Sequence, residues 1–456
     1  MTRGTPRLLV AFAALTIVLA ACGDGNASPS PDGSGAAGDE AVTLSFHRFF
    51  GDCAEDYADV TDPAEGEGEC GIIQVLTNQW NAEHPEAQIE TVVTEHDQHY
   101  QRLTAGIAAG EPPDIVIVHG RLLPNFASRG LLTPLDDLFA DAGIDVDDFL
   151  PTAREHASWE DTLYALPFDL QTILWHINVD MWDEAGLVDG GVPQIPQSRD
   201  EFLEAAEQFT EATGQPFITA QMDGFIGTHW TTDAFVWQQG GELFREEEGQ
   251  MRANVDTPEM REAVQFMLDL FDAGYAPNNA DYGAAESAFL NGEAGSLING
   301  TWAVGIYDPQ VSGGEAAFQN YYVAPFPQLF GEPAAWSDSH TWAIPTRESP
   351  DPAKTAAAVQ FLKFLNDNQQ QWVRTGHLTV RQSVLDSPEF AELPHRDEYG
   401  AAAELLRTEP RIRQIEAFRT IMNEELVAIY LGQKTLDDGL ASAQERIDEA
   451  LRLAGF

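Results

Sequence analysis

Most of the side chains in this sequence that could do chemistry are carboxylates. Asp and Glu together number 74, and two carboxylates flanking a sugar linkage are the catalytic pair of a glycoside hydrolase. In so acidic a chain, however, close pairs arise without any catalytic role. His96 and His99 have the i, i+3 spacing of a metal-binding pair, but solvated helix histidines share that spacing. The chain has no nucleophile elbow, P-loop or His-Glu-x-x-His motif. We therefore expect no enzyme activity, no catalytic residue, no metal and no cofactor.

The first residues indicate where the protein acts. Arg3 and Arg7 precede a largely apolar run over 8–21, which is the pattern of a secretory signal peptide. The run is too short to cross a bilayer, which takes roughly 20 residues. It ends in Leu-Ala-Ala before Cys22, which resembles the bacterial lipobox, where the cysteine is lipidated and becomes the mature N-terminus. The alternative is an ordinary secretory signal with an incidental Cys22.

The segment that follows is expected to be a tether. It is built almost wholly from Gly, Ser, Pro, Ala, Asp and Glu, with no aromatic residue, so it cannot bury enough apolar surface to fold. We expect a signal peptide at 1–21, a lipidated cysteine with a flexible linker at 22–41, and a globular body from residue 42. This order predicts an exported protein, anchored by lipid to the outer face of the bacterial cytoplasmic membrane.

The two further cysteines could form a disulfide. If Cys22 carries lipid, Cys53 and Cys70 remain as a pair in an oxidising compartment, which favours a disulfide. The bond would close a short loop and stabilise the fold by about 3 kcal/mol in the chain-entropy model. A metal site is the alternative, although two cysteines without a nearby histidine pair make a poor zinc ligand set.

The charge of the chain excludes several classes of partner. Lys and Arg total only 24, so the formal net charge is −50 at pH 7. Such a surface repels nucleic acid and anionic lipid. The carboxylates are spread along the chain rather than gathered in one run, which favours a solvated acidic surface over a site for a cation such as a polyamine. A body of roughly 415 residues is comfortable for two domains at about 150 residues each.

The pattern of apolar residues predicts an open α/β sheet at the start of the body. Strands and helices should alternate, with strands at 42–46, 88–93 and 114–118 and helices at 72–82 and 97–109. In such sheets, ligands bind at the carboxyl ends of the strands. Segments 49–52 and 119–121 lie at those ends.

A second α/β region follows, and it shows no internal repeat. We expect strands at 173–177, 296–298 and 341–344, and helices at 200–210, 260–273, 353–365, 409–431 and 436–450.

With these elements in order, the chain resembles the sugar-type extracellular solute-binding proteins of bacterial ABC importers (family 1), the group of maltose-binding protein. The resemblance runs from about Val42 to Leu451. It is carried by the segments 79–85, 109–115 with 130–135, 163–167 with 176–178, 290–294 with 298–302, and 376–381. His119-Gly120-Arg121 departs from the acidic–basic pair of that group, and the Cys53–Cys70 insertion lies where it could cover the cleft.

The resemblance implies an α/β fold of two lobes, the type II periplasmic-binding-protein fold, with a hinge and a ligand cleft between the lobes. The chain should cross between the lobes near 167–169, near 324–326 and near 387–411. Lobe one is then 42–167 plus 326–388, and lobe two is 169–324 plus 410–456.

The same resemblance suggests the ligand site. Sugars need flat aromatic surfaces and fixed hydrogen-bonding groups, and Trp302 lies in a segment similar to the one that supplies a stacking tryptophan in the family. We expect His229 and Trp230 in a loop ahead of a helix containing Asp233, and Trp336, Asp338 and His340 in a polar loop before a strand. The full set of candidate ligand-binding residues is Trp302, Asp169, Gln171, Trp230, His229, Trp336, Asp338, His340, Arg381, Arg121, Asp52 and Phe50.

The function expected from the resemblance is capture rather than catalysis. The protein would be a monomeric substrate-binding lipoprotein that closes around a sugar-like solute, a mono- or oligosaccharide or a polyol, and delivers it to membrane permease subunits. One alternative is a binding protein for a cationic or peptide solute, whose cleft would carry several carboxylates and lack stacked tryptophans. Less favoured are a secreted glycoside hydrolase and a structural or sensory surface lipoprotein.

Overall fold

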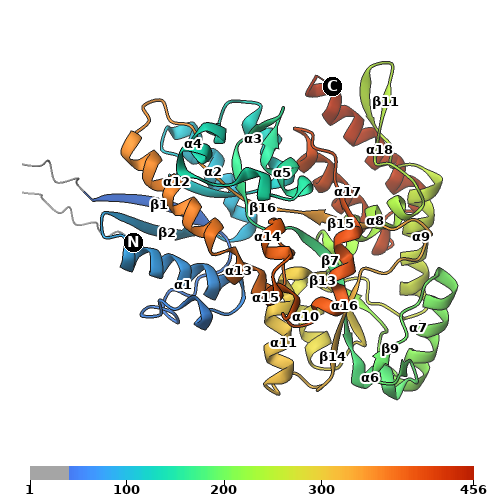
Figure 1. Ribbon diagram of the computed structural model, residues 1–456. Helices are drawn as coiled ribbons and strands as arrows, with labels where there is room; N and C mark the ends of the chain where they lie inside the picture. Colours follow the sequence, from blue (N-terminus) through green and yellow to red (C-terminus); the bar gives the residue numbers. More distant parts are fainter. Residues whose placement is uncertain (1–40, 456) are drawn as a thin grey trace, which may run out of the picture. The chain divides into compact units, whose positions relative to one another are not determined.

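The computed structural model describes residues 41–455. The expected signal peptide, the lipid site at Cys22 and the linker up to residue 40 lie outside the described residues. Within 41–455, no helix is long and apolar enough to cross a membrane. The described chain contains two main β-sheets, each covered by helices (Figure 1).

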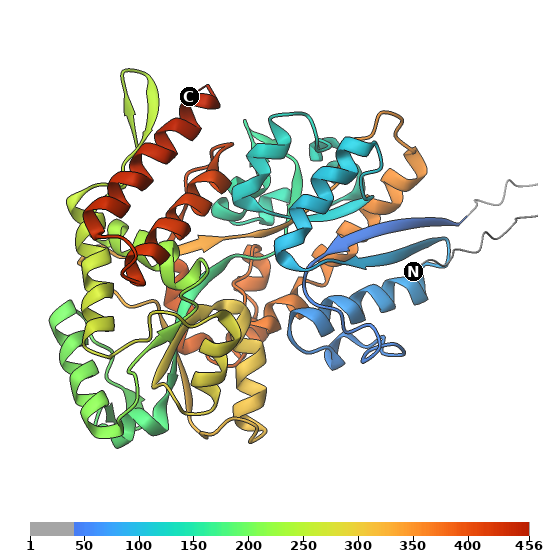
Figure 2. The ribbon, with the colours of Figure 1, turned by 180° about the vertical axis from the view of Figure 1, so that it is seen from behind.

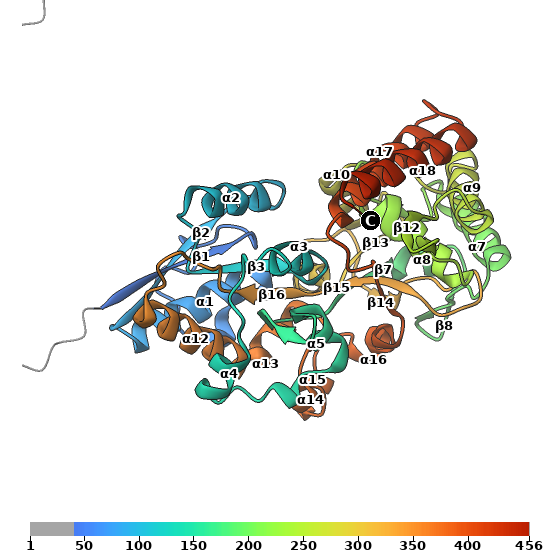
Figure 3. The same cartoon turned by 90° about the horizontal axis from the view of Figure 1, so that it is seen from above.

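The first sheet has the strand order β2-β1-β3-β16-β6. Its strands are β2 (Ala87–Val93), β1 (Val42–Arg48), β3 (Ile115–His119), β16 (His340–Ala343) and β6 (Ala165–Pro167). The pairs β1–β2 and β1–β3 are parallel, whereas β16 is antiparallel to both of its neighbours. All five residues of β3 are buried, as expected for a strand covered on both faces. Helix α2 (His96–Ala109) lies on one face, and α1 (Gly68–Glu83) and α12 (Pro352–Asp367) lie on the other (Figure 3).

The second sheet has the order β10-β13-β7-β15-β17, with β14 also paired to β7. Its strands are β10 (Thr219–Ala220), β13 (Ser296–Gly300), β7 (Gln171–Asn178), β15 (Ala335–Asp338), β17 (Leu406–Thr408) and β14 (Tyr321–Pro325). Successive side chains of β7 point to opposite faces. Trp175 packs on Trp182 of α6 (Val179–Glu184) and on Phe202 of α7 (Arg199–Thr213). His176 contacts Tyr307 of α11 (Val304–Ser312) on the other face.

The remaining elements surround these sheets. The other α-helices are α3 (Leu123–Ala127), α4 (Asp136–Ala142), α5 (Pro151–Ala157), α8 (Thr231–Gln238), α9 (Pro258–Asp272), α10 (Tyr282–Leu290), α13 (Gln369–Trp372), α14 (Gln382–Leu385), α15 (Pro388–Ala391), α16 (Arg396–Tyr399), α17 (Ile415–Tyr430) and α18 (Leu436–Leu453). The small strands pair as β4 (Ser158–Trp159) with β5 (Thr162–Leu163), β8 (Val188–Asp189) with β9 (Val192–Pro193), and β11 (Phe244–Glu247) with β12 (Gln250–Ala253). Figure 2 shows the β11–β12 hairpin beside the C-terminal helices, where α18 contacts β12.

Short helical turns complete the chain. They are η1 (Pro63–Glu65), η2 (Gly120–Leu122), η3 (Val146–Asp148), η4 (Ile226–Trp230), η5 (Thr301–Ala303), η6 (Val373–Thr375) and η7 (Gly400–Glu404).

Two helix starts differ from the sequence expectation by four residues or more. The helix expected at 409–431 begins only at Ile415; Pro410 disfavours a helical conformation for Glu409 but does not by itself account for residues 410–414. Helix α1 begins at Gly68, four residues before the expected start. That earlier start places Cys70 in the first turn of α1, where it forms the expected disulfide with Cys53. The disulfide therefore ties the loop after β1 to the start of α1.

The chain passes between the two sheets at short segments. Residues 168–170 connect β6 to β7, and Ser339 alone connects β15 to β16. The second passage was expected near 324–326. It comes later because β15 pairs with β7 through Ser337 and Thr172 and so belongs to the second sheet. A third segment leaves the first sheet's helices after α13, touches Leu170 through Leu378, and reaches the second sheet at β17.

Candidate functional site

Aromatic and polar side chains gather where the strands end and the chain crosses between the sheets. Phe49 and Phe50 follow β1, and His119 ends β3. Asp169 lies between β6 and β7, and His340 begins β16. Strand ends of this kind are where open α/β sheets bind ligands.

Asp169 is the centre of the buried part of this region. Its Oδ1 accepts the backbone N–H of His340 at 2.9 Å, and its Oδ2 accepts His340 Nδ1–H and Trp372 Nε1–H, both at 2.8 Å. Burial alone would raise the pKa of this carboxyl, but the charges on His340 and His377 and the bonds from His340 lower its pKa to about 2. Asp169 lies in the first connecting segment and bonds His340, which follows Ser339 of the second, and Trp372, which immediately precedes the third.

His340 is held by Asp169 and packed among other rings. Burial would lower the pKa of its imidazole, but Asp169 outweighs this effect and raises the pKa above its usual value. Ring centroids of His340 lie 5.0 Å from Phe50 and 4.9 Å from His119. Phe49, which is only partly buried, stacks on His119 at 5.2 Å. The end of β1 and the end of β3 thus meet at His340.

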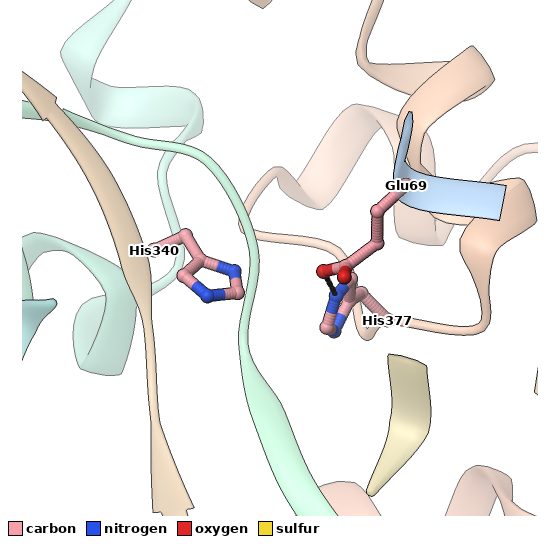
Figure 4. A group of neighbouring side chains, drawn as sticks. All are labelled: Glu69, His340 and His377. Atoms are coloured by element: carbon pink, nitrogen blue, oxygen red, sulfur yellow. Dashed lines mark hydrogen bonds and ion pairs between the residues drawn. The ribbon is translucent and has the colours of Figure 1, made fainter. Parts of the chain in front are cut away.

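Figure 4 shows how Glu69, from the first turn of α1, reaches His377. His377 Nε2–H donates to Glu69 Oε1 at 2.8 Å, and Thr301 Oγ1 hydrogen-bonds with His377 Nδ1 at 2.9 Å. Glu69, His340 and His377 present ligand atoms within 4.8 Å of one another, a spacing that could hold a metal ion. Asp169 Oδ2, however, lies 2.8 Å from His340 Nδ1 and 3.7 Å from His377 Nε2. The imidazoles therefore already serve two carboxylates as hydrogen-bond donors.

Three tryptophans continue from His377 toward the second sheet. The rings of Trp302 and His377 lie 6.5 Å apart, and Trp230 meets Trp302 edge-on at 6.3 Å. Trp230 stacks on Trp336 at 3.5 Å. Trp336 is fully buried, whereas Trp302 and Trp230 keep part of their surface exposed. Trp302 Nε1–H donates to the hydroxyl of Tyr282 at 3.1 Å, which leaves the faces of its ring for packing.

An ion pair links the end of β3 to β15. The Arg121 guanidinium contacts Asp338 Oδ2, and Arg121 N–H donates to Asp338 Oδ1 at 3.1 Å. Burial would raise the pKa of Asp338, but Arg121 and the nearby His156, whose Nδ1 lies 3.6 Å from Asp338 Oδ1, lower that pKa to about 2. Arg121 Nε also lies 3.5 Å from Glu416 of α17. This pair therefore connects the first sheet, the crossing strand and the C-terminal helices.

A second group of possible metal ligands is His229, Asp233 and Glu409, all buried. His229 Nδ1 lies 3.1 Å from Asp233 Oδ2 and 3.4 Å from Glu409 Oε1. Burial lowers the pKa of His229 to about 3 and raises the pKa of both carboxyl groups well above their usual values. Burial thus disfavours charge on all three side chains, and His229 lies next to Trp230 with a ring distance of 6.2 Å.

The structure brings most of the candidate residues into these clusters. Phe50, Asp169 and His340 meet at the connecting segments, as described above. Two local expectations were wrong. Trp336 and Asp338 lie in strand β15 and His340 begins β16, instead of forming a polar loop, because β15 pairs with β7. His229 and Trp230 lie in the helical turn η4, which runs directly into α8, instead of in a loop.

Arg381 and Asp52 bond residues outside these clusters, and Gln171 pairs with Asp338 only through the strands β7 and β15. Arg381 Nε donates to Asp148 Oδ2 and its Nη1 to the carbonyl of Asn366, each at 2.7 Å. Asp52 is exposed and accepts the N–H of Ala54. Gln171 begins β7 with a buried side chain. A ligand-binding role for these three stays a prediction.

Several residues of the region were not among the candidates. They are Phe49, Glu69, His119, Tyr282 and His377. Phe49 and His119 carried a signal, because both follow predicted strands at the ligand-binding end of the sheet. Glu69 and Tyr282 carried none, since only the folded chain brings their helices to the tryptophans.

A two-sheet α/β body whose aromatic site lies at the crossing segments is typical of binding proteins that close by a hinge. The chain matches the family model described as bacterial extracellular solute-binding protein over residues 68–372. The chain belongs to this family, and it is therefore an exported solute-binding protein rather than an enzyme.

Individual relatives and a solved structure agree with this assignment. The chain is 25% identical over 347 residues to the maltotriose-binding protein of Pyrococcus abyssi, covering 74% of this chain and 69% of the relative. It is 25% identical over 440 residues to the sn-glycerol-3-phosphate-binding periplasmic protein UgpB of Escherichia coli, covering 85% and 91%. The GacH receptor of Streptomyces glaucescens superimposes with a TM-score of 0.75 at 21% identity, covering 90% and 99%. This likeness confirms the two-lobe fold.

Proposed function

We propose that the protein captures a neutral sugar-like solute, a mono- or oligosaccharide or a polyol, and delivers it to the permease of an ABC importer. The observation that carries this proposal is the pair of partly exposed tryptophans, Trp302 and Trp230, which meet at 6.3 Å beside the crossing segments. Pyranose rings present apolar C–H faces that pack on such indole surfaces. Maltotriose and sn-glycerol 3-phosphate, the ligands for which the two relatives are named, both carry more than one hydroxyl group.

Polar groups around the tryptophans suit hydroxyls. Glu69 accepts a hydrogen bond from His377, whose ring lies 6.5 Å from the ring of Trp302. The Tyr282 hydroxyl accepts a hydrogen bond from Trp302 itself. Glu286 accepts the hydroxyl of Tyr307 at 2.6 Å, and burial raises the pKa of Glu286. Carboxylates and phenols of this kind accept and donate the hydrogen bonds that fix sugar hydroxyls.

The charge of the site favours a neutral solute over an anionic one. Arg419 lies over the Trp230 ring at 5.4 Å, but it also contacts Glu416 at 3.3 Å. Arg121 is paired with Asp338. Both nearby guanidinium groups are thus matched by carboxylates, and a phosphate at the tryptophans would also face Glu69. A glycerol phosphate is therefore a poorer fit than an uncharged sugar or polyol.

The same proposal includes the arrangement of the whole protein. The two sheets are the centres of two lobes, with boundaries near 168–170, Ser339 and 378–405. Closure of the lobes needs only that the solute bind the closed form better than the open one. A lipid on Cys22 and a flexible linker up to residue 41 would keep this monomeric receptor close to its permease.

A thermal-shift screen tests the proposed solute class. Purified protein is melted with mono-, di- and oligosaccharides, polyols, glycerol 3-phosphate and polyamines, because a ligand that binds only the folded state raises Tm. The proposal expects a saturable shift with a neutral sugar or polyol, and Trp302→Ala should remove it. Trp159, a partly buried tryptophan in β4, provides the matched control Trp159→Ala. A shift confined to polyamines or to glycerol 3-phosphate would overturn the sugar assignment.

A further inference from the structure

A second pocket, of about 200 Å³, lies apart from the tryptophans. Three parts of the chain line it: residues 66–72 at the start of α1, the start of α11, and the segment that runs from η6 to α16. Neither Trp302 nor Trp230, the two partly exposed tryptophans proposed for the solute, belongs to this lining. The contacts of this pocket therefore do not depend on which solute the protein carries.

Arg396 is the charged group buried against this pocket. Only 6% of the residue is exposed. Its Nη2 donates to the carbonyls of Val373 at 2.5 Å and of His377 at 2.8 Å. The guanidinium lies over the rings of Phe390 at 4.6 Å and Tyr399 at 5.1 Å. These contacts fix the group in one position.

The rest of the guanidinium has no partner. Within the described part of the chain, Nε and Nη1 of Arg396 make no hydrogen bond, and no carboxylate forms an ion pair with Arg396. A buried cation without a counter-charge is strongly destabilising, whereas one matched by an anion with good geometry is tolerated. The guanidinium of Arg396 in the pocket lining therefore lacks a negatively charged partner.

Two helices begin at the same pocket. Gly68 is the first residue of α1 and Val304 the first of α11, and both residues line the pocket. Their N-cap residues, Glu67 and Ala303, make no side-chain capping bond. The N–H groups of a helix's first turn have no acceptor within the helix and carry the positive end of its dipole. Helix N-termini of this kind bind anions.

The carboxylates of the lining do not cancel this positive character. Asp308 Oδ1 accepts His395 Nε2–H at 3.1 Å. Burial would lower the pKa of His395, but its hydrogen bonds to Asp308 and Glu398 raise that pKa to about 9. Glu67 has an exposed side chain. Arg374 adds a second guanidinium, which donates hydrogen bonds to the backbone carbonyls of Pro63, Ala64 and Gly66. The carboxylates of Glu67 and Asp62 act on Arg374, so the uncompensated positive charge of the lining is that of Arg396.

We propose that this pocket binds a small free anion, a halide or an inorganic oxyanion such as phosphate, against Arg396 and the N-termini of α1 and α11. The anion accepts hydrogen bonds from Arg396 Nε and Nη1 and from first-turn N–H groups. The volume of the pocket, about 200 Å³, suits a small anion better than a whole sugar. Pockets for drug-sized ligands measure roughly 300–1,000 Å³. The site lies next to the solute region through His377, whose carbonyl holds Arg396 and whose ring holds Glu69.

Anion binding is tested on the purified protein by thermal shift and by crystallography. Sodium phosphate and sodium chloride are titrated against sodium isethionate at constant ionic strength, with no sugar present. A saturable rise in Tm is expected for the wild type. In Arg396→Gln the apparent Kd should weaken at least tenfold. Arg129→Gln, which alters an exposed arginine outside the pocket, should behave as the wild type.

A wild-type crystal soaked in bromide keeps the proposal testable if Arg396→Gln fails to fold. Anomalous density beside Arg396 Nη1 would support it, and an empty pocket at high bromide would overturn it. Equal anion effects in the wild type and Arg396→Gln would overturn it as well. So would a shift seen with glycerol 3-phosphate but not with inorganic phosphate, because the positive charge would then belong to the solute site. Failure of the sugar screen leaves each of these outcomes unchanged.

Discussion

Asp169→Asn is the substitution that tests most sharply how the crossing segments are held. The change keeps the size of the side chain but removes its charge and one acceptor oxygen. Asp169 accepts two bonds from His340 and one from Trp372, each between 2.8 and 2.9 Å. The amide nitrogen of asparagine would face at least one of these N–H donors. We therefore expect loss of stability rather than a neutral replacement.

The cost follows from burial and charge. Asp169 is fully buried and faces a histidine whose pKa it raises. Removing one partner of a buried ion pair costs about 3–5 kcal/mol, and losing a single charge-assisted hydrogen bond costs about 1.5–3 kcal/mol. Because the amide oxygen retains part of the bonding, we expect Asp169→Asn to lower the free energy of unfolding by about 3 kcal/mol near pH 5.

The penalty should also depend on pH. The folded pKa of Asp169, about 2, lies below its usual value, so its contribution is present above about pH 4 and is lost as the pH falls through 2. The folded pKa of His340 is raised, so its contribution is present below about pH 6.5 and is lost as the pH rises through the folded value. The cost of Asp169→Asn should therefore be larger at pH 5 than at pH 9.

Urea unfolding followed by tryptophan fluorescence measures both quantities. Asp147→Asn is the matched control, because Asp147 is an exposed aspartate whose pair with Arg154 is solvated. The reasoning is refuted if Asp169→Asn unfolds at the same urea concentration as the control. It is also refuted if the loss of stability is the same at pH 5 and pH 9.

Three further substitutions have defined outcomes. Replacing Cys53 and Cys70 by Ser opens a loop with a sequence separation of 17. Urea unfolding should show that the free energy of unfolding falls by about 3 kcal/mol. An unchanged urea midpoint would contradict a stabilising role for the disulfide. Burial raises the pKa of Asp233 well above its usual value, so Asp233→Asn should match or exceed the wild-type Tm at pH 7.5 and lose that gain at pH 4; a large loss at pH 7.5 would show a charged Asp233. Trp302→Ala should abolish the solute-induced Tm shift while circular dichroism stays native, and a retained shift would remove Trp302 from the site.

Much of the fold follows from local sequence patterns. The apolar run at 114–118 predicted a strand covered on both faces, and β3 is buried throughout. Pairing of the two free cysteines predicted the Cys53–Cys70 bond. The order of β15 and β16 was not predictable, because β15 is a short strand whose place is decided by its pairing with β7, far away in the sequence. Pro410 did indicate that Glu409 would not be helical.

The candidate site was predictable only in part. Trp302 and Trp230 could be chosen because aromatic residues in the expected segments suit a sugar, and the structure places them in contact. The roles of Asp169 and Asp338 depend on His340 and Arg121, which come from other elements and become their partners only in the folded chain. Arg396 gave no sequence signal, since its missing partners are evident only once the surrounding backbone is in place.

The most direct test of the central claim is a crystal structure of the protein with the neutral sugar or polyol that gives the largest thermal shift. The account predicts density for the solute against the exposed faces of Trp302 and Trp230, with its hydroxyl groups bonded to carboxylate or phenol groups of the surrounding helices. A solute bound elsewhere, or one bound with neither tryptophan in contact, would contradict it.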